Sequence, residues 1–542
     1  MIRLKFFKIS LLIVIPVLVF LTAFSIKNYE GPYWLGSNSD PEYVYLLNSL
    51  NLSQFRQVQY VDHPGTTLEV LGAGVIKVFH KIRAKDTIIN DVLHNPELYL
   101  NAINLVIVLT LVLSILLIGL LTLFLTGNIL FALIIQATPF LSYTLLNTLY
   151  RVSPEPLMLV ATMWFSFIVL YIFYNCIQEN PVREHGDELN ADISSSKMEG
   201  SSGREAAGGR YNKEKYSKFS IFLLAILSGF LITTKIDSAP IVIVPLVFLK
   251  WKEKITYFLV TFLGLIFFTL PIYNRYSWFL NWTYRIFIHS GYFGQGSANI
   301  VNLPSFLQNL KTIFNTESFL VLSIFILTVS CLVFIVQKRK FNWNKYAFAI
   351  LAFYVLDVLI VAKHFDNHYL VPSLSVLGLS SVMILSILKN SKIRIIAGIL
   401  ILIFAGRNLL FEIHSTKGIS PYYQESIKID DFVNENYPTA IKVSYYRSSS
   451  IEYALNFGNE WAFHRYDKQL SEMYPNNYFY EIWSEELYNW GNLTTLPNYG
   501  SIIFQGTPFK GAYLKYKPDL VMQDVYKGDS QTVYLVHKHA PH

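Results

Sequence analysis

Two carboxylates are the first residues of this sequence whose type and position could do chemistry. Asp40 and Glu42 stand on either side of a proline, at the head of a stretch with helical apolar spacing. A carboxylate beside a cavity could act as a general base or bind a cation. An aspartate directly before proline is also a preferred helix N-cap, which is a purely structural role. We predict Asp40 as the main catalytic candidate and Glu42 as the second.

Five basic or imidazole side chains elsewhere could contact phosphate, because cationic donors form strong hydrogen bonds to phosphate oxygens. They are His63, Arg151, Lys235, Lys363 and His368. Each has a structural alternative: a turn before a helix, a side chain that reaches to the membrane surface, or a local ion pair. We predict that these five residues bind a donor phosphate.

A third group could contact the rest of a substrate. Asp62 and Glu155 are carboxylates close to these cations, and Arg285, His289 and Tyr292 belong to an aromatic run with three glycines. Glycine allows close approach of a ligand to the backbone. The structural alternative is an aromatic belt at the membrane surface with a flexible loop. The run has the spacing of neither a dinucleotide fingerprint nor a P-loop.

Metal binding is the least supported chemistry. The alternation of His364, Asp366 and His368 has ligand-like spacing, but a helix that starts at Tyr369 would splay the three side chains. Two cysteines in apolar segments provide no disulfide framework and no metal knuckle. The sequence indicates no certain cofactor and leaves a role for a divalent metal open.

The composition shows what must position these residues. The chain has 542 residues, of which 53% are hydrophobic and only 15% charged, and its mean hydropathy is +0.36. Soluble domains carry about 25% charged residues. The composition therefore excludes an ordinary cytosolic enzyme and a disordered protein, and it favours a chain that lies mostly in lipid. The net charge of +7 is distributed as a membrane-orientation signal, which does not indicate nucleic acid binding.

Apolar runs predict a polytopic α-helical membrane protein with about eleven spans. We place them at 9–26, 101–123, 127–146, 155–177, 219–235, 238–250, 255–273, 318–337, 345–362, 369–388 and 393–411. The segments then assigned to the inside hold most of the loop Lys and Arg, so the positive-inside rule predicts a cytoplasmic N-terminus and an outer C-terminus. The ionisable candidates above would gather at the outer ends of the helices.

Residues 1–411 would form the transmembrane domain and 412–542 a small soluble α/β domain outside the membrane. Within the first, we expect a long outer loop over 27–100, a disordered cytoplasmic loop over 178–218 and an outer aromatic and glycine-rich loop over 274–316. Two amphipathic stretches in the first outer loop, beginning near Ser39 and Thr66, predict helices that lie flat in the membrane interface. In the tail, we expect helices at 429–437 and 449–457 and strands at 441–446, 501–505 and 532–537.

The order of these features resembles the GT-C superfamily of membrane glycosyltransferases. It is most similar to family 39-like bacterial proteins related to protein O-mannosyltransferases and aminoarabinose transferases. The resemblance covers the whole chain in topology. Locally it is carried by Asp40, by Asp62-His63-Pro64-Gly65, and by His368-Tyr369-Leu370-Val371-Pro372. The family has a second proline where Gly65 stands, and an arginine where His368 stands.

The resemblance implies an inverting transferase for hexosyl or pentosyl groups that acts in the cell envelope. Its donor would be a sugar linked to polyprenyl phosphate, its surroundings membrane lipid, and its acceptor a glycan, lipid or protein on the outer face of a bacterial inner membrane. Asp40 would activate the acceptor hydroxyl. Three alternatives remain: a glycolipid transporter or flippase, a polysaccharide ligase or polymerase with a diphosphate-linked donor, and a non-catalytic scaffold.

Overall fold

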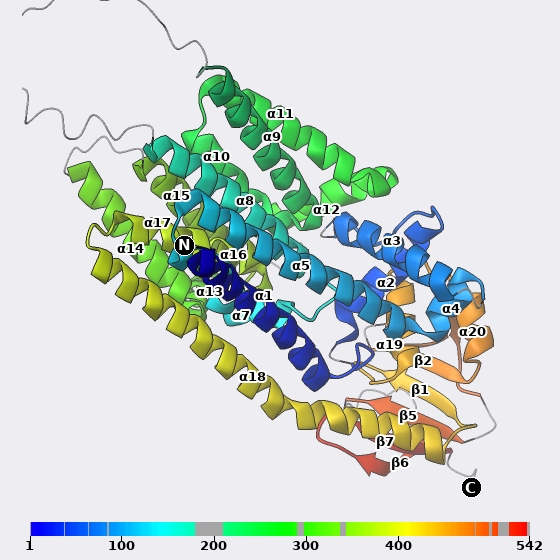
Figure 1. Ribbon diagram of the computed structural model, residues 1–542. Coiled ribbons are helices and arrows are strands. Elements are labelled where there is room, and N and C mark those ends of the chain that lie inside the picture. The colour runs from blue at the N-terminus through cyan, green and yellow to red at the C-terminus, as the bar shows by residue number, and fades with distance from the viewer. Residues whose placement is uncertain are drawn as a thin grey trace, which may run out of the picture.

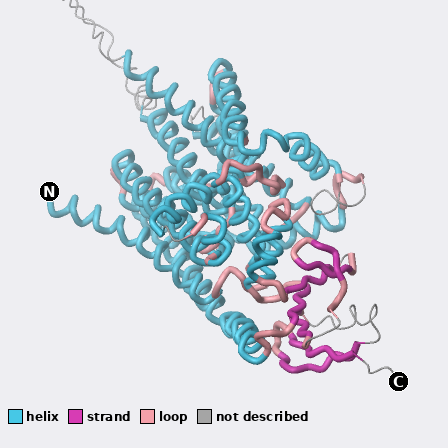
Figure 2. The backbone as a smooth tube through the Cα atoms, turned by 90° about the vertical axis from the view of Figure 1, so that its right-hand side faces the viewer, coloured by secondary structure: helices cyan, strands magenta, loops and turns pink. Residues whose placement is uncertain are grey.

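A body of long helices with a β-sheet at one end makes up the computed structural model of this chain (Figures 1 and 2). It describes residues 2–36, 38–62, 64–83, 86–178, 210–289, 298–336, 343–482, 484–497, 501–507 and 520–538. Most of the predicted cytoplasmic loop 178–218 lies outside these residues. The chain enters at one end of the helical body, and its last strands belong to the sheet at the other end.

The helical body is built from segments with these bounds: α1 Ile2–Glu30, α2 Ser39–Ser53, α3 Thr66–Arg83, α4 Ile88–His94, α5 Pro96–Thr126, α6 Ile129–Gln136, η1 Thr138–Leu141, α7 Tyr143–Thr148, α8 Pro154–Gln178, α9 Arg210–Thr234, η2 Ile236–Val242, α10 Ile243–Phe248, α11 Trp251–Phe268, η3 Leu270–Arg275, α12 Tyr276–Ile288, α13 Leu303–Thr316, α14 Ser318–Val336, α15 Trp343–Lys363, η5 Asn367–Leu370, α16 Val371–Ser375, α17 Leu377–Ile387 and α18 Ser391–Asn436.

The chain is an integral membrane protein with fewer unbroken spans than predicted. Among the described residues, six helices are long and apolar enough to cross a membrane, or up to eight if each of two bent pairs counts as one span. The predicted number of eleven is therefore not confirmed. The predicted outer loop 274–316 also contains two helices, α12 and α13, and α11 turns by 76° into the segment that ends with α12.

Prolines explain two of the missing spans. The predicted span 127–146 is divided into α6, η1 and α7, and Pro139 lies in the 3₁₀ turn η1. The predicted span 238–250 is divided into η2 and α10, which contain Pro240 and Pro245. Proline lacks a backbone N–H and clashes with the preceding turn, so it interrupts an α-helix. A prediction of membrane spans from apolar content alone does not take these interruptions into account.

The two helices of the first predicted outer loop behave differently. Helix α2 does not leave its apolar face free for lipid, because α3 packs on one side of it and α19 (Ile451–Glu460) on another, and most of its residues are buried. The contact is close: a Cβ atom at Gly458 would lie 2.6 Å from the carbonyl oxygen of Tyr43. Helix α3 keeps Val78 and Ile82 exposed, as expected of an interfacial helix.

Helix α18 joins the helical body to the sheet without a break (Figure 1). The predicted span 393–411 and the predicted helix 429–437 are parts of this one helix. The sheet contains β1 Ile441–Tyr445, β2 Asn477–Glu481, β3 Glu486–Asn489, β4 Asn492–Thr494, β5 Ile502–Gly506, β6 Leu520–Lys527 and β7 Thr532–Lys538, in the order β4-β3-β2-β1-β5-β7-β6. Strands β2 and β5 pair parallel with β1, and the other pairs are antiparallel. The predicted strands at 441–446, 501–505 and 532–537 are confirmed.

One face of the sheet is covered by helices. Ile429 and Val433 of α18 pack with Ile503 of β5 and Val533 of β7 in one apolar cluster. Further along, α19 and α20 (Asp467–Met473) pack with residues of α2 and with Phe479 of β2. The sheet is thereby fixed against the segment that carries Asp40 and Glu42.

Candidate functional site

The predicted candidates Asp40, Arg151 and His368 come together where the helical body meets the sheet. They come from the start of α2, the connection between α7 and α8, and η5. Arg151, Arg447 and His368 are the charges that act on the Asp40 carboxyl. A fourth segment therefore joins the site, because Arg447 belongs to the connection between β1 and α19.

Asp40 is exposed, and its carboxylate is not used by the helix that follows. Its backbone is extended, with φ −106° and ψ 122°, as sterics require before proline. Among the described residues no backbone or side-chain donor bonds its carboxylate, so the expected N-cap hydrogen bond is not formed. Desolvation by the surrounding protein raises the pKa of Asp40, although Arg151, Arg447 and His368 oppose the shift. The result is an accessible carboxylate that is a stronger base than an ordinary aspartate.

Glu42 is fully buried and holds Arg151 in place. The Arg151 Nε donates to Glu42 Oε1 at 2.8 Å, and Nη2 donates to Oε2 at 3.4 Å. The same Nη2 also donates to the backbone carbonyl of Asp40 at 3.3 Å. Burial raises the pKa of Glu42 to about 6, although Arg151 opposes the shift. The Arg151 side chain is 29% exposed, so the guanidinium is fixed beside Asp40 with part of its surface open.

A second ion pair lies deeper. The Lys235 ammonium is 2.5 Å from Glu155 Oε1 and 3.8 Å from Asp237 Oδ2, and it lies 4.6 Å from the ring centre of Tyr369. The Lys235 side chain is only 2% exposed. The expected local pairing of Lys235 with Asp237 is thus the weaker of its two contacts. Lys235 has little free surface in this arrangement.

A cavity of about 260 Å³ opens beside this pair. Its walls are mostly apolar and include side chains of α12 and α15, and Lys235, Asp237 and Tyr369 are among its polar lining residues. Lys363 also lines the cavity, and its ammonium donates to the carbonyls of Ile286 at 2.6 Å and Phe287 at 2.5 Å. These carbonyls end α12 and have no partner within the helix. Mostly apolar walls that also carry two lysines suit a lipid chain with a negatively charged head.

The predicted metal-like triplet is splayed. His368 Nδ1 lies 2.9 Å from Asp366 Oδ1, and the hydrogen bond from His368 lowers the pKa of Asp366. His364 instead bonds the backbone of Ile286 and His289 near the end of α12. Within the part of the chain that the structure describes, no group of three or more His, Cys, Asp or Glu side chains could hold a metal ion.

The remaining candidates are not among the charges that act on the Asp40 carboxyl. The indole nitrogen of Trp278 in α12 donates to Asp62 at 3.5 Å, and desolvation raises the pKa of Asp62. Arg285 is exposed on α12 and forms no ion pair with another described residue, and His289 follows the end of that helix. His63 and Tyr292 lie outside the described residues.

Sequence reasoning missed Arg447 and Tyr60. Arg447 is exposed, and its left-handed backbone (φ 58°) lies against residue 36, where a Cβ atom would lie 1.9 Å from the Arg447 carbonyl oxygen. Tyr60 packs edge-on against Tyr45 and Trp461 at centroid distances of 5.5 and 5.7 Å. No local pattern marks either residue, because the contacts join the first predicted outer loop to the C-terminal tail.

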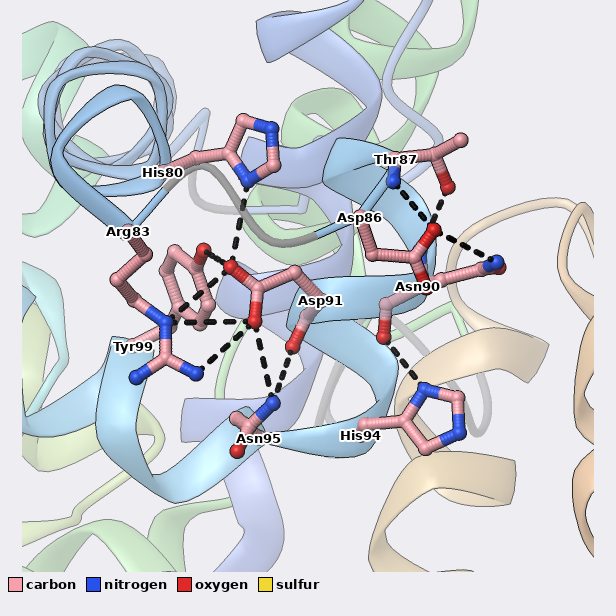
Figure 3. Close-up of polar contacts among 9 residues, drawn as sticks. All are labelled: His80, Arg83, Asp86, Thr87, Asn90, Asp91, His94, Asn95 and Tyr99. Atoms are coloured by element: carbon pink, nitrogen blue, oxygen red, sulfur yellow. Dashed lines mark hydrogen bonds and ion pairs between the residues drawn. The ribbon is translucent and has the colours of Figure 1, made fainter.

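A further carboxylate cluster in the first predicted outer loop lies outside this site. Asp91 of α4 is surrounded by side chains of α3 and α5 and is almost completely paired (Figure 3). None of the residues in Figure 3 was a predicted candidate. The cluster ties α3, α4 and α5 together.

Solved structures with this fold are known. The chain is similar to two crystal structures of ArnT from Cupriavidus metallidurans, one bound to undecaprenyl phosphate and one in the apo state. Each alignment covers 97% of this chain and 97% of ArnT with a TM-score of 0.55, at 10% and 11% sequence identity respectively. No protein-family model matches the sequence. No curated protein sequence matches it either. The expected resemblance is confirmed at the level of the fold: this chain folds like ArnT, an aminoarabinose transferase of the GT-C kind.

Proposed function

We propose that this protein is an inverting glycosyltransferase that moves a sugar from a polyprenyl-phosphate-linked donor to an acceptor on the outer face of the membrane. The observation that carries the proposal is the Asp40 carboxylate, which is exposed, unbonded within the described residues and placed near Arg151, Arg447 and the His368 imidazole. ArnT, which shares this fold, has been crystallised with undecaprenyl phosphate, and this supports the proposed class of donor.

The proposed reaction is a single in-line displacement at the anomeric carbon. Asp40 accepts the proton of the acceptor hydroxyl as its oxygen forms a bond to that carbon. The bond from the carbon to the phosphate oxygen breaks at the same time, and the polyprenyl phosphate leaves with the electron pair. One displacement inverts the anomeric configuration. The raised pKa of Asp40 suits it to this task.

The leaving phosphate gains negative charge that neighbouring cations must stabilise. Arg151 and Arg447 stand beside Asp40 with exposed surface, and His368 completes the group. Glu42 acts through Arg151, whose guanidinium it orients. Lys235 and Lys363 are bonded to Glu155 and to the end of α12, and we assign them to the wall of the donor cavity. The role of His63 as a donor phosphate contact remains a prediction. So do the substrate contacts predicted for Asp62, Arg285, His289 and Tyr292.

The donor cavity explains the need for a membrane body. Its apolar walls would take the first units of the polyprenyl chain, while the phosphate lies near Lys235 and Tyr369, which also line the cavity. The proposed location is a bacterial inner membrane, with the N-terminus in the cytoplasm and the sheet outside. The positive-inside distribution of Lys and Arg supports this orientation.

The test is release of polyprenyl phosphate by the purified full-length protein in nanodiscs. A panel of undecaprenyl-phosphate sugars is supplied with candidate acceptors, and the wild type is compared with Asp40→Asn. Asp86→Asn is the matched control, since Asp86 is an exposed aspartate of the same predicted loop. We expect release by the wild type and the control, and little release by Asp40→Asn.

Two results would redirect the proposal. Release that is unaffected by Asp40→Asn would keep a transferase but remove Asp40 from its chemistry. No release from any monophosphate donor by folded protein would favour the alternatives, a ligase or polymerase with a diphosphate-linked donor, or a glycolipid transporter. Movement of lipid across the bilayer without bond cleavage would identify the transporter.

A further inference from the structure

A second cavity, with polar walls, lies on another side of Arg151. It has a volume of about 340 Å³ and is bounded by the end of α1, the connection between α7 and α8, and the middle of α18. Polar groups that line it include Glu30, Asn38, Arg151, Glu412 and Thr416. It shares no lining residue with the apolar donor cavity. In Figure 1, α18 lies on the opposite side of the helical body from α11 and α12.

The two carboxylates of this cavity are buried, and one of them is incompletely bonded. Glu30 is 7% exposed and has hydrogen-bond partners in Tyr150 and Tyr423. Glu412 is 4% exposed, and Thr416 is the one described residue that bonds its carboxylate, with Oγ1 donating to Oε1 at 3.3 Å. Among the described residues the other oxygen of Glu412 has no partner. That oxygen is not enclosed by the protein, so a ligand in the cavity that donates a hydrogen bond could pair with it.

The charges of the cavity decide which ligands suit it. Arg151 is its one cation, and Glu42 already pairs with that guanidinium. Glu30 and Glu412 therefore leave the cavity with an excess of carboxyl oxygens and with no unpaired cation among its described lining residues. Carboxylates accept hydrogen bonds and donate none, so they suit hydroxyl groups. A phosphate or a carboxylate would find no unpaired cation among the described residues that line this cavity.

Apolar surface beside the cavity indicates that the ligand has a lipid tail. Leu410 and Phe411 of α18, which directly precede Glu412, are 70% and 53% exposed. Ile419, which lines the cavity, is 46% exposed. These residues belong to a helix that is apolar enough to span the membrane. A headgroup in the cavity could thus remain attached to a chain in the bilayer.

We infer that this cavity binds the acceptor, and that the acceptor is the hydroxyl-rich, uncharged headgroup of a lipid. The inference rests on the proposed function and names its acceptor class. Arg151 connects the cavity to the reaction centre, because the guanidinium lines the cavity and donates to the Asp40 carbonyl at 3.3 Å. Donor and acceptor would then approach Asp40 from different sides of the helical body.

Lipid binding to the purified full-length protein tests this inference by native mass spectrometry. The probes are monoglucosyl diacylglycerol, phosphatidylglycerol with the same acyl chains, and undecaprenyl phosphate. We expect the wild type to bind the glucosyl lipid about tenfold more tightly than phosphatidylglycerol, the effect of one hydrogen bond to a charged group. Ser415→Trp, which fills the cavity, should abolish this preference and leave undecaprenyl phosphate binding unchanged.

Two matched controls separate the cavity from general effects on α18. His414→Trp places the same bulk on an exposed neighbour outside the cavity and should bind like the wild type. Glu412→Gln should weaken binding of the glucosyl lipid about tenfold, whereas Glu435→Gln, at an exposed position of the same helix, should not.

Several results would overturn the inference. They are no binding of the glucosyl lipid by the wild type, equal binding of phosphatidylglycerol, or equal behaviour of Ser415→Trp and His414→Trp. A wild type that binds the glucosyl lipid but not undecaprenyl phosphate would count against the proposed donor instead. The two failures can therefore be told apart.

Discussion

Two aspartates of the same predicted loop, Asp40 and Asp91, have opposite surroundings. Asp91 is 4% exposed, and its carboxylate has four side-chain partners (Figure 3): His80, Arg83, Asn95 and Tyr99. The shortest contact is the hydroxyl of Tyr99, at 2.5 Å. The Asp40 carboxylate is exposed and has no hydrogen-bond partner within the described residues. Both aspartates lie near an arginine, so proximity to a cation does not distinguish them.

Because their hydrogen bonding differs, the pKa values of the two carboxyl groups shift in opposite directions. Burial alone would raise the pKa of Asp91, but hydrogen bonds from Tyr99, Arg83 and His80 outweigh it and lower the pKa. Desolvation dominates at Asp40 and raises the pKa. A carboxylate whose oxygens are fully hydrogen-bonded and whose pKa is low is a weak base, and its bonds hold helices together. A carboxylate without hydrogen-bond partners and with a raised pKa can accept a proton from a substrate.

The strongest test of this contrast compares Asp40→Asn with Asp91→Asn. Loss of a general base should lower the rate of sugar transfer about 10²–10⁴-fold in Asp40→Asn. Asp91→Asn should leave the rate unchanged, because Asp91 lies outside the site. The measurement is the initial rate of polyprenyl phosphate release in nanodiscs. Equal losses in both variants would end the distinction between a reactive and a structural aspartate.

Glu42→Gln should have the next largest effect. It removes one partner of a buried ion pair and leaves Arg151 without its carboxylate. Breaking such a pair costs about 3–5 kcal/mol, and the partial exposure of Arg151 places the expected loss at the lower limit, about 3 kcal/mol. The thermal unfolding midpoint should fall, and transfer should slow because the guanidinium is no longer oriented. Glu435→Gln, at an exposed position of α18, is the control and should unfold like the wild type.

The sequence predicted Asp40 and Arg151 for a physical reason. Charged residues are excluded from lipid, so those beside apolar runs must collect at the ends of membrane helices, where polar sites form. The same reasoning could not find Arg447. Its approach to the Asp40 segment depends on contacts such as the bond from the Gly36 amide to Ser449 Oγ at 3.0 Å, between residues 413 positions apart.

The apolar content of the sequence also could not predict that α2 is buried or that two of the predicted spans are divided. The spacing of α2 fits an interfacial helix as well as a core helix, and only the packing of α19 decides between them. Glu69 shows the same limit: as a charged residue of an amphipathic helix it would be placed on the solvent-facing side of α3, yet it is fully buried. Local patterns predict that a helix forms, whereas tertiary contacts decide which face is covered.

Asp91→Asn should affect stability where Asp40→Asn does not. An asparagine keeps the shape but cannot accept all the hydrogen bonds that His80, Arg83 and Tyr99 donate. Leaving buried donors unsatisfied costs about 1–3 kcal/mol. We expect a lower thermal unfolding midpoint for Asp91→Asn and an unchanged or slightly higher one for Asp40→Asn. A stable Asp91→Asn variant would show that the cluster of Figure 3 does not hold α3, α4 and α5 together.

The smallest expected effect is a difference in how stability depends on pH. The folded-state pKa of Asp91 lies below its unfolded value of about 3.9, so its stabilisation is complete above about pH 5 and is lost as the pH falls through the folded pKa. The effect of Asp40 on stability has the opposite dependence on pH. The folded-state pKa of Asp40 is raised, so the folded state takes up the proton first, and Asp40 adds stability as the pH falls.

Thermal unfolding of the wild type and both variants, followed from pH 7 downward, should therefore separate the three proteins. The decline should be shallower in Asp91→Asn, which lacks the lost stabilisation, and steeper in Asp40→Asn, which lacks the compensating gain. Parallel curves for the two variants would mean that both carboxylates titrate alike, and the contrast between them would not explain which one does chemistry.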